Sequence, residues 1–154
     1  MQYKLTLLAV KDVEVSKRFY TELFDQEVVL DLGCNVTFSG GFAIQQEFAW
    51  LVHLPPGAVV EKSNNVELYF EVDDFDQFLT RLGEYQEIEY VHLPKKHDWQ
   101  QRVARIYDPD FHIIEIGESK TVIANRYLTA GYSVEETAAI IQHPVEFVER
   151  VKSL

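Results

Sequence analysis

The sequence has 154 residues, of which 47% are hydrophobic and 13% aromatic, enough for one compact core and a small appendage. Its formal net charge is −11, and the whole acidic excess lies in residues 1–118, because residues 119–154 hold equal numbers of basic and acidic side chains. Nucleic-acid-binding proteins owe most of their affinity to clustered cations that neutralise phosphates, so this charge argues against a nucleic-acid partner.

The N-terminal segment has none of the features of an export signal. "MQYKLTLLAVKD" lacks a basic region followed by an apolar stretch and a small-residue cleavage site, and no apolar run in the sequence is long enough to span a membrane. Cys34 is the single cysteine, so no internal disulfide can form, and its place in a predicted hairpin turn indicates an inert thiol. We therefore expect a cytoplasmic protein with no membrane partner.

The first half of the chain alternates between two periodicities. "YKLTLLAV" predicts a strand, and the next segment, "DVEVSKRFYTELF", predicts a helix with Asp12 as N-cap and Val15, Phe19 and Leu23 at helical spacing. Three short strands are then predicted at "EVVLDL", "NVTF" and "FAIQQEF", separated by glycines. The predicted order is β-α-β-β-β.

The same order returns from residue 66. "VELYFEV" predicts a strand, and "DDFDQFLTRLGEY" predicts a helix with one apolar face. That face comprises Phe75, Phe78, Leu79 and Leu82, and the last three predicted strands are "EIEYVHL", "RVARIYD" and "HIIEIG". This internal duplication predicts an α+β fold of tandem βαβββ modules, residues 1–60 and 61–118, forming a curved mixed-sheet cup, with a C-terminal helical tail over residues 119–154.

The tail carries three helix-end signals. Gly131 is placed as a C′ residue, Ser133 and Glu136 form a capping box, and Pro144 is placed at a first helical position, so three short helices are expected. The pattern is similar to helix-turn-helix segments, but the balanced charge argues against DNA reading. We expect the tail to pack on the sheet or on a second subunit.

Three motifs carry a family resemblance. "KDVEVSKRFYTELF", "EVDDFDQFLTRL" and "YDPDFHIIEIGE" resemble the vicinal oxygen chelate superfamily, which includes glyoxalase I, bleomycin-resistance proteins and extradiol dioxygenases. The resemblance covers residues 3–118. It implies a small-molecule ligand bound in the sheet cup, a homodimer, and in many members a divalent metal such as Mn, Mg, Ni or Zn. Because this scaffold hosts isomerases, dioxygenases, thiol transferases and pure binding proteins, it does not choose among them.

The resemblance also implies four positions for metal ligands. Aligned on the two modules, these positions hold Leu5, Gln45, Glu67 and Glu115 in this sequence. Leu5 cannot bind a metal, so the candidate ligands are Gln45, Glu67 and Glu115, and the two glutamates are also the candidate catalytic residues for proton transfer. Two carboxylates and an amide oxygen suit Mn²⁺ or Mg²⁺ better than Zn²⁺. Two alternatives stay open: a hydrated, metal-free pocket for an organic ligand, and a strand register that turns these side chains to solvent.

Strand alternation offers an independent prediction of the side chains that line the cup. Alternate residues face opposite sides of a sheet, which places three groups of residues toward the cup: Glu67, Tyr69 and Glu71; Ile113, Glu115 and Gly117; and Ala43, Gln45 and Glu47. Such an acidic cup requires compensation by a cation, an arginine or water.

The segment "HLPKKHDWQQR" is a long connection that carries further candidate ligand-binding residues. His97, Trp99 and Arg102 offer a titratable ring, a flat apolar face and a planar anion clamp, and with Gln45 and Tyr69 they complete the predicted ligand-binding set. The run resembles an "HxWGQR" signature of a subgroup of uncharacterised glyoxalase-like proteins, with Gln100 in place of glycine. Asp108-Pro109-Asp110 is expected to be turn chemistry, and His112 to face the helix or the surface.

The sequence thus predicts a glyoxalase/bleomycin-resistance-like protein that binds a small organic molecule, and whether it is an enzyme stays open. One hypothesis is divalent-metal-assisted lyase, isomerase or dioxygenase chemistry on a small oxygenated substrate. The alternatives are a non-enzymatic sequestering or sensing module, which the missing ligand at Leu5 favours, and a protein that recruits a partner through its tail.

Overall fold

The chain divides into two compact units. The computed structural model describes every residue except Gln86. The first unit comprises Met1–Glu67, Tyr85–Glu89 and Tyr107–Ile113, and the second comprises Leu68–Glu84, Tyr90–Ile106 and Ile114–Leu154. No helix among the described residues is both long and apolar enough to cross a membrane.

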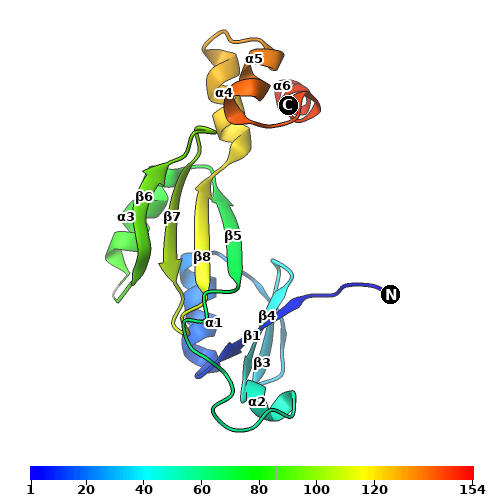
Figure 1. The fold of residues 1–154 in the computed structure, drawn as a ribbon, viewed down its shortest axis with the longest axis vertical. Helices are drawn as coiled ribbons and strands as arrows, with labels where there is room; N and C mark the ends of the chain where they lie inside the picture. The colour runs from blue at the N-terminus through cyan, green and yellow to red at the C-terminus, as the bar shows by residue number, and fades with distance from the viewer. Residues whose placement is uncertain (86) are drawn as a thin grey trace. The chain divides into compact units, whose positions relative to one another are not determined.

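The first module has the predicted βαβββ order. Its elements are β1 (Thr6–Val10), α1 (Val13–Leu23), β2 (Val28–Asp31), β3 (Asn35–Phe38) and β4 (Phe42–Gln46), followed by a short α2 (Phe48–Leu51). The sheet order is β1-β4-β3-β2, with β1 parallel to β4 and the other two pairs antiparallel (Figure 1). The parallel β1–β4 pair follows from α1, which is the crossover between β1 and the rest of the sheet.

Helix α1 is positioned by its cap and by an aromatic cluster. The Asp12 carboxylate accepts hydrogen bonds from the backbone N–H groups of Glu14 and Val15, which confirms the predicted N-cap. Tyr20 is fully buried, with its ring centroid 4.9 Å from that of Phe42. The helix therefore anchors the core of the first unit.

Two details of the first module differ from the sequence-based expectation. Val15 is 44% exposed, because α1 buries Val13, Ser16, Phe19, Tyr20 and Leu23 instead. The predicted last strand ends at Gln46: Glu47 has a left-handed backbone (φ 56°), which turns the chain into α2 and removes Glu47 from the strand face. Hydropathy alone could not detect this turn, because residues 42–48 contain neither glycine nor proline to mark it.

The second module repeats the order. Its elements are β5 (Glu67–Val72), α3 (Phe75–Glu84), β6 (Tyr90–Lys96), β7 (Arg102–Tyr107) and β8 (Ile113–Glu118), and the sheet order is β5-β8-β7-β6. Helix α3 buries Phe75, Phe78 and Leu82 as predicted. The tandem βαβββ architecture expected from the internal duplication is confirmed, with one four-stranded mixed sheet in each module.

The tail folds into three helices with a core of their own. They are α4 (Lys120–Thr129), α5 (Val134–Ile141) and α6 (Val145–Lys152). The Ser133–Glu136 capping box and the C′ position of Gly131 (φ 95°) are confirmed, whereas Pro144 is the N-cap of α6 and not its first helical residue. The buried members of this core are Ile123, Ala124, Ala138, Ile141, Val148 and Val151. The helices thus cover much of one another's apolar surface.

Candidate functional site: the polar face of the second sheet

Strand β5 shows the alternation that the sequence predicts. Glu67, Tyr69 and Glu71 are exposed, whereas the three residues between and after them are half-buried. Gly117 on β8 lies on the same side as Tyr69, because a Cβ atom at Gly117 would lie 3.0 Å from the Tyr69 ring. Alternation places Glu115 on this side of β8 as well. We use the term polar face for Tyr69, Glu71, His92, His97, Trp99, Gln101, Arg105 and Glu115.

Glu115 forms an ion pair with an arginine. It is 9% exposed, and its carboxylate pairs with the guanidinium of Arg105 on β7. Arg105 also donates from Nη1 to Nε2 of His92 at 3.1 Å. Because arginine can only donate, His92 Nε2 is an acceptor, and His92 Nδ1 donates to the Leu93 carbonyl oxygen at 2.9 Å. An arginine therefore supplies the compensation that a buried carboxylate requires.

Gln45 and Glu67 lie in the first unit. The Gln45 amide is 7% exposed, and both of its ends are used: Oε1 accepts from Asn35 Nδ2 at 2.9 Å and Nε2 donates to the Gln46 carbonyl at 2.6 Å. Glu67 is exposed at the start of β5. Within the part of the chain that the structure describes, no three His, Cys, Asp or Glu side chains are grouped to hold a metal ion.

The metal-ligand assignment therefore stays a prediction, and the environments of two of its members do not suit a bound cation. A divalent ion at Glu115 would have to displace Arg105. The Oε1 atom of Gln45 already accepts a hydrogen bond from Asn35. The fourth family position, Leu5, has no ligand atom. These residues do not fit a divalent metal, so no chemical step is routed through one.

A chain of hydrogen bonds links the loop that precedes β7 to strand β5. Trp99 Nε1 donates to Gln101 Oε1 at 3.0 Å, and Gln101 Nε2 donates to the Tyr69 hydroxyl at 2.7 Å and to the Glu118 carbonyl at 3.0 Å. The Tyr69 hydroxyl in turn donates to Glu71 at 2.7 Å. Burial, then the hydrogen bond to Glu71, raises the pKa of Tyr69 to about 12, so its hydroxyl stays a donor. The structure thus brings together two predicted residues, Tyr69 and Trp99.

Gln101 is a residue of the candidate site that is absent from the set predicted from the sequence. Its side chain is 2% exposed and makes the three hydrogen bonds that hold the chain together. Gly117 leaves the space for it, since a Cβ atom there would lie 2.5 Å from Gln101 Nε2. The signal was present in the "HDWQQR" motif, where Gln101 matches a fixed position of the pattern.

His97 is stacked on Trp99. The ring centroids are 4.0 Å apart and the planes differ by 8°. Burial, reinforced by the positive charges of Lys95 and Arg105, lowers the pKa of His97, so the ring is neutral at neutral pH. Its Nε2 atom is buried and has no hydrogen-bond partner among the described residues. Gln100, which follows Trp99, has a φ angle of 69°. Glycine adopts this left-handed conformation most readily, and the related signature has glycine at this position.

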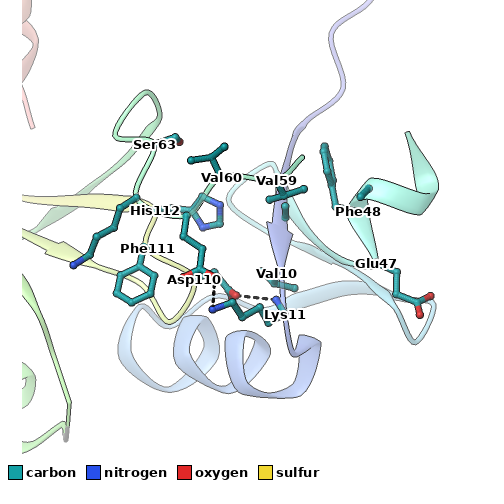
Figure 2. A pocket seen from close by; sticks show the side chains of 14 residues that line it. Val10, Lys11, Glu47, Phe48, Val59, Val60, Ser63, Asp110, Phe111 and His112 are labelled. Atoms are coloured by element: carbon teal, nitrogen blue, oxygen red, sulfur yellow. Dashed lines mark hydrogen bonds and ion pairs between the residues drawn. The ribbon is translucent and has the colours of Figure 1, made fainter. Parts of the chain in front are cut away.

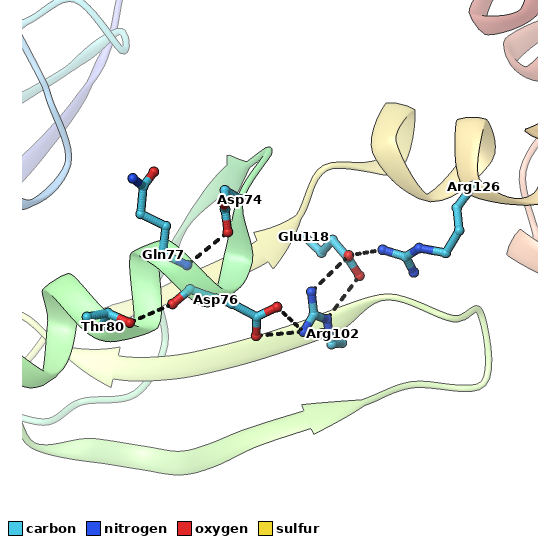
Figure 3. Close-up of polar contacts among 7 residues, drawn as sticks. All are labelled: Asp74, Asp76, Gln77, Thr80, Arg102, Glu118 and Arg126. Carbon is cyan, nitrogen blue, oxygen red and sulfur yellow. Dashed lines mark hydrogen bonds and ion pairs between the residues drawn. The ribbon is translucent and has the colours of Figure 1, made fainter.

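Arg102 lies in an ion-pair network (Figure 3). Its Nη1 contacts both Asp76 oxygens at 2.9 and 3.0 Å, and its Nη2 donates to Glu118 Oε1 at 3.1 Å. Glu118 is 1% exposed and also pairs with Arg126 on α4. An external anion would have to compete with two carboxylates for Arg102, so the structure gives this residue a structural role. Its assignment as a ligand-binding residue stays an untested prediction.

The tandem βαβββ order is that of the vicinal oxygen chelate superfamily. More specifically, the chain belongs to the glyoxalase-like domain family, whose profile matches residues 3–121. No curated protein matches the chain.

Solved structures support the same classification. A protein of unknown function from Agrobacterium tumefaciens is 33% identical, with a TM-score of 0.66, over 77% of this chain and 94% of that one. A lactoylglutathione lyase from the same organism is 25% identical, with a TM-score of 0.59, over the same shares. A glyoxalase-related enzyme from Fulvimarina pelagi is 21% identical, with a TM-score of 0.64, over 79% of this chain and 90% of that one. Residues 122–154, most of the tail, lie beyond the family match.

Proposed function

We propose that this protein binds a small oxygenated organic molecule on the polar face, with an arginine in the role that a metal has in many relatives. The observation that carries the proposal is the Arg105–Glu115 pair: Arg105 keeps 25% of its side-chain surface exposed while its charge neutralises a buried carboxylate. A guanidinium can hold a carboxylate through two parallel hydrogen bonds.

The aromatic part of the face supplies the second contact. The stacked His97–Trp99 pair belongs to the same face, and the charge of Arg105 contributes to the lowered pKa of His97. A planar acid can pack beside these rings while its oxygens face Arg105. Such an arrangement binds without needing turnover, which favours a sequestering or sensing module over a metal-dependent enzyme.

Fluorescence of Trp99 tests this proposal. The sequence has two tryptophans, and Trp50 is 75% exposed, so Trp50→Phe leaves Trp99 as the sole reporter. Titration of this variant with benzoate and other planar carboxylates is expected to give saturable quenching that EDTA does not abolish. Adding Arg105→Met is expected to weaken binding about tenfold or more, the value of a charge-assisted hydrogen bond.

Two further variants make the result decisive. Arg105→Lys keeps the charge and protects the fold against an unpaired Glu115, but it loses the planar fork, so binding weakens here too. Arg150→Met, on an exposed tail position, is the matched control and is expected to leave quenching unchanged. The proposal is wrong if benzoate quenches Trp99 equally in the Arg105 variants, or if quenching depends on added metal.

We also propose that the protein is a homodimer. Strand β2 is an edge strand of the first sheet, and all four of its residues are exposed, including Val29 at 67% and Leu30 at 48%. An exposed apolar edge is a template for pairing with another chain. Sedimentation velocity is expected to give a dimer that Val29→Lys converts to monomer. A monomeric parent protein would contradict the proposal.

A further inference from the structure

The first unit contains a pocket that no residue of the polar face lines. It has a volume of about 250 Å³ (Figure 2). Its walls come from the end of β1, the start of α2, the loop around residues 59–63 and the turn at residues 110–112. Half of the 14 lining residues are apolar, among them Val10, Phe48, Val60 and Phe111. Small-molecule sites combine apolar walls with polar groups that fix the orientation of the ligand.

The principal polar group in this pocket is a histidine oriented by a buried aspartate. His112 lines the pocket, and its Nδ1 lies 2.8 Å from Oδ2 of Asp108, which is 3% exposed. The Tyr20 hydroxyl also donates to Asp108 at 2.7 Å, and the backbone N–H groups of Asp110 and His112 donate to its other oxygen. An ionised carboxylate can only accept, so His112 Nδ1 carries the proton.

The second ring nitrogen is therefore the reactive one. No described residue hydrogen-bonds His112 Nε2, whereas the ring itself is held in place by Asp108. Burial lowers the pKa of His112, but the hydrogen bond and charge of Asp108 outweigh it, and the net pKa is raised. The imidazolium form, in which Nε2 donates a hydrogen bond, is thus accessible near neutral pH.

Four of the five other charged residues that line the pocket have partners. Lys11 Nζ lies 2.8 Å from Glu61, and Lys62 Nζ lies 2.7 Å from Glu89 and 4.7 Å from the Phe111 ring centroid. Asp110 accepts from the Lys11 backbone N–H at 2.7 Å and from the Ser16 hydroxyl at 2.8 Å. Glu47 is the remaining acidic lining residue. His112 differs from these groups because a buried carboxylate fixes its ring and leaves the second ring nitrogen for a ligand.

The backbone around the pocket is held in an unusual conformation. Three lining residues other than glycine, Glu47, Lys62 and Phe111, have left-handed φ angles of 56°, 49° and 65°. Non-glycine residues adopt this region infrequently, and such residues cluster at functional sites. The three positions come from different parts of the chain, so the strain surrounds the pocket.

We infer that this pocket is a second binding site, for a small organic acid with an apolar body, and that His112, oriented by Asp108, binds its carboxylate. When the neutral acid enters, its proton moves to His112 Nε2 and the resulting imidazolium donates a hydrogen bond to the carboxylate. The proton balance needs no other reactant. The apolar body packs against Phe48, Val60 and Phe111.

An NMR titration tests this inference. Benzoate is added to the full-length protein while the imidazole Hε1–Cε1 signals of the five histidines are followed. Benzoate is expected to shift the His112 signal and to move its titration midpoint to higher pH, because the anion stabilises the imidazolium. Benzamide, which has the same shape but no charge, is expected to bind about tenfold more weakly.

Three variants locate the site. His112→Gln can still donate to Asp108, and it is expected to weaken benzoate binding at this pocket about tenfold. Val60→Asp adds a negative charge from a loop position that is 69% exposed, leaves the His112–Asp108 pair intact and is also expected to weaken binding. His53→Gln, an exposed histidine outside the pocket lining, is the control. Loss of ligand binding at the polar face would be detected by Trp99 fluorescence. Trp99 does not line this pocket, so the two sites are tested separately.

The inference is overturned by either of two results. One is that the His112 signal does not respond to benzoate, whatever Trp99 shows. The other is a response of the same affinity in His112→Gln or Val60→Asp, read from the backbone amides of Phe48 and Phe111.

Discussion

Replacing Arg102 with methionine is expected to lower the free energy of unfolding by about 2–4 kcal/mol. The substitution removes two hydrogen bonds from Glu118, which is 1% exposed, and leaves Arg126 as its sole cationic partner among the described residues. A buried carboxylate that loses a partner keeps its desolvation cost, which is the reason that breaking one side of a buried pair costs more than the pair contributes. Urea unfolding measures the change.

The pH dependence of this effect identifies its cause. Burial raises the pKa of Glu118, but the hydrogen bonds from Arg102 and Arg126 outweigh it and lower the net pKa below the ordinary value of 4.5. A lowered pKa contributes stability above the unfolded-state value, and this stability is lost as the pH falls through the folded-state value. The difference in the free energy of unfolding between the parent and Arg102→Met is therefore expected to be largest at neutral pH and to shrink below about pH 4.

Arg150→Met is the matched control for Arg102→Met. Arg150 is exposed on α6, so its loss is expected to change stability by less than about 0.5 kcal/mol. An Arg102 variant that is as stable as the Arg150 variant would contradict the role of the network in joining α4 to the sheet. A destabilisation that persists unchanged into acid would assign the effect to the packing of Arg102 over Phe75, where its guanidinium lies 5.0 Å from the ring centroid.

Local signals were sufficient to predict the fold. The repeated βαβββ order, the apolar helix faces and the capping box at Ser133 are each assembled from signals that lie within a single helix, strand or turn. The errors have the same origin. Val15 has helical spacing but lies on the solvent side, because the buried face is set by the position of the sheet and not by hydropathy alone.

The site was less predictable, because its partners are far apart in the sequence. Strand alternation places Glu115 and Tyr69 on the cup side, but it carries no information that Arg105 neutralises Glu115 or that Gln101 donates to Tyr69. Asp108 was predicted to take part in a turn, and its hydrogen bonds from the backbone N–H groups of Asp110 and His112 agree with this. Its contact with Tyr20, which is 88 residues away, was not predicted. Ion pairs and buried hydrogen bonds between distant residues leave no periodicity to detect.

Removing the tail provides the second large effect, because Trp99 is covered by it. Trp99, Lys120, Ile123, Ile141 and His143 surround a gap too small for a water molecule. The first turn of the tail is also tied to β5, since the backbone N–H groups of Ser119 and Lys120 donate to the Val72 carbonyl and to Glu71. The tail helices therefore complete the second unit in addition to forming a core of their own.

A chain that ends after Thr121 keeps Glu118 but loses Arg126, Ile123 and Ile141. We expect its melting temperature to fall by at least several degrees, since a loss of about 1 kcal/mol corresponds to roughly 2–4 °C at this chain length. In the Trp50→Phe background, the emission of Trp99 is expected to shift to the red as water replaces the two isoleucines. Differential scanning calorimetry and fluorescence spectra measure the two changes.

Two point variants separate loss of packing from loss of the charge network. Ile141→Ala removes apolar cover but no charge, so it is expected to shift the Trp99 emission while the pH dependence of stability stays that of the parent. Arg126→Met removes a cation from Glu118 but leaves the isoleucines. It is therefore expected to change the pH dependence of stability and to leave the Trp99 emission unchanged. If the truncated chain keeps both the emission maximum and the melting temperature of the parent, the tail is an independent appendage, and the contacts around Trp99 do not stabilise the second unit.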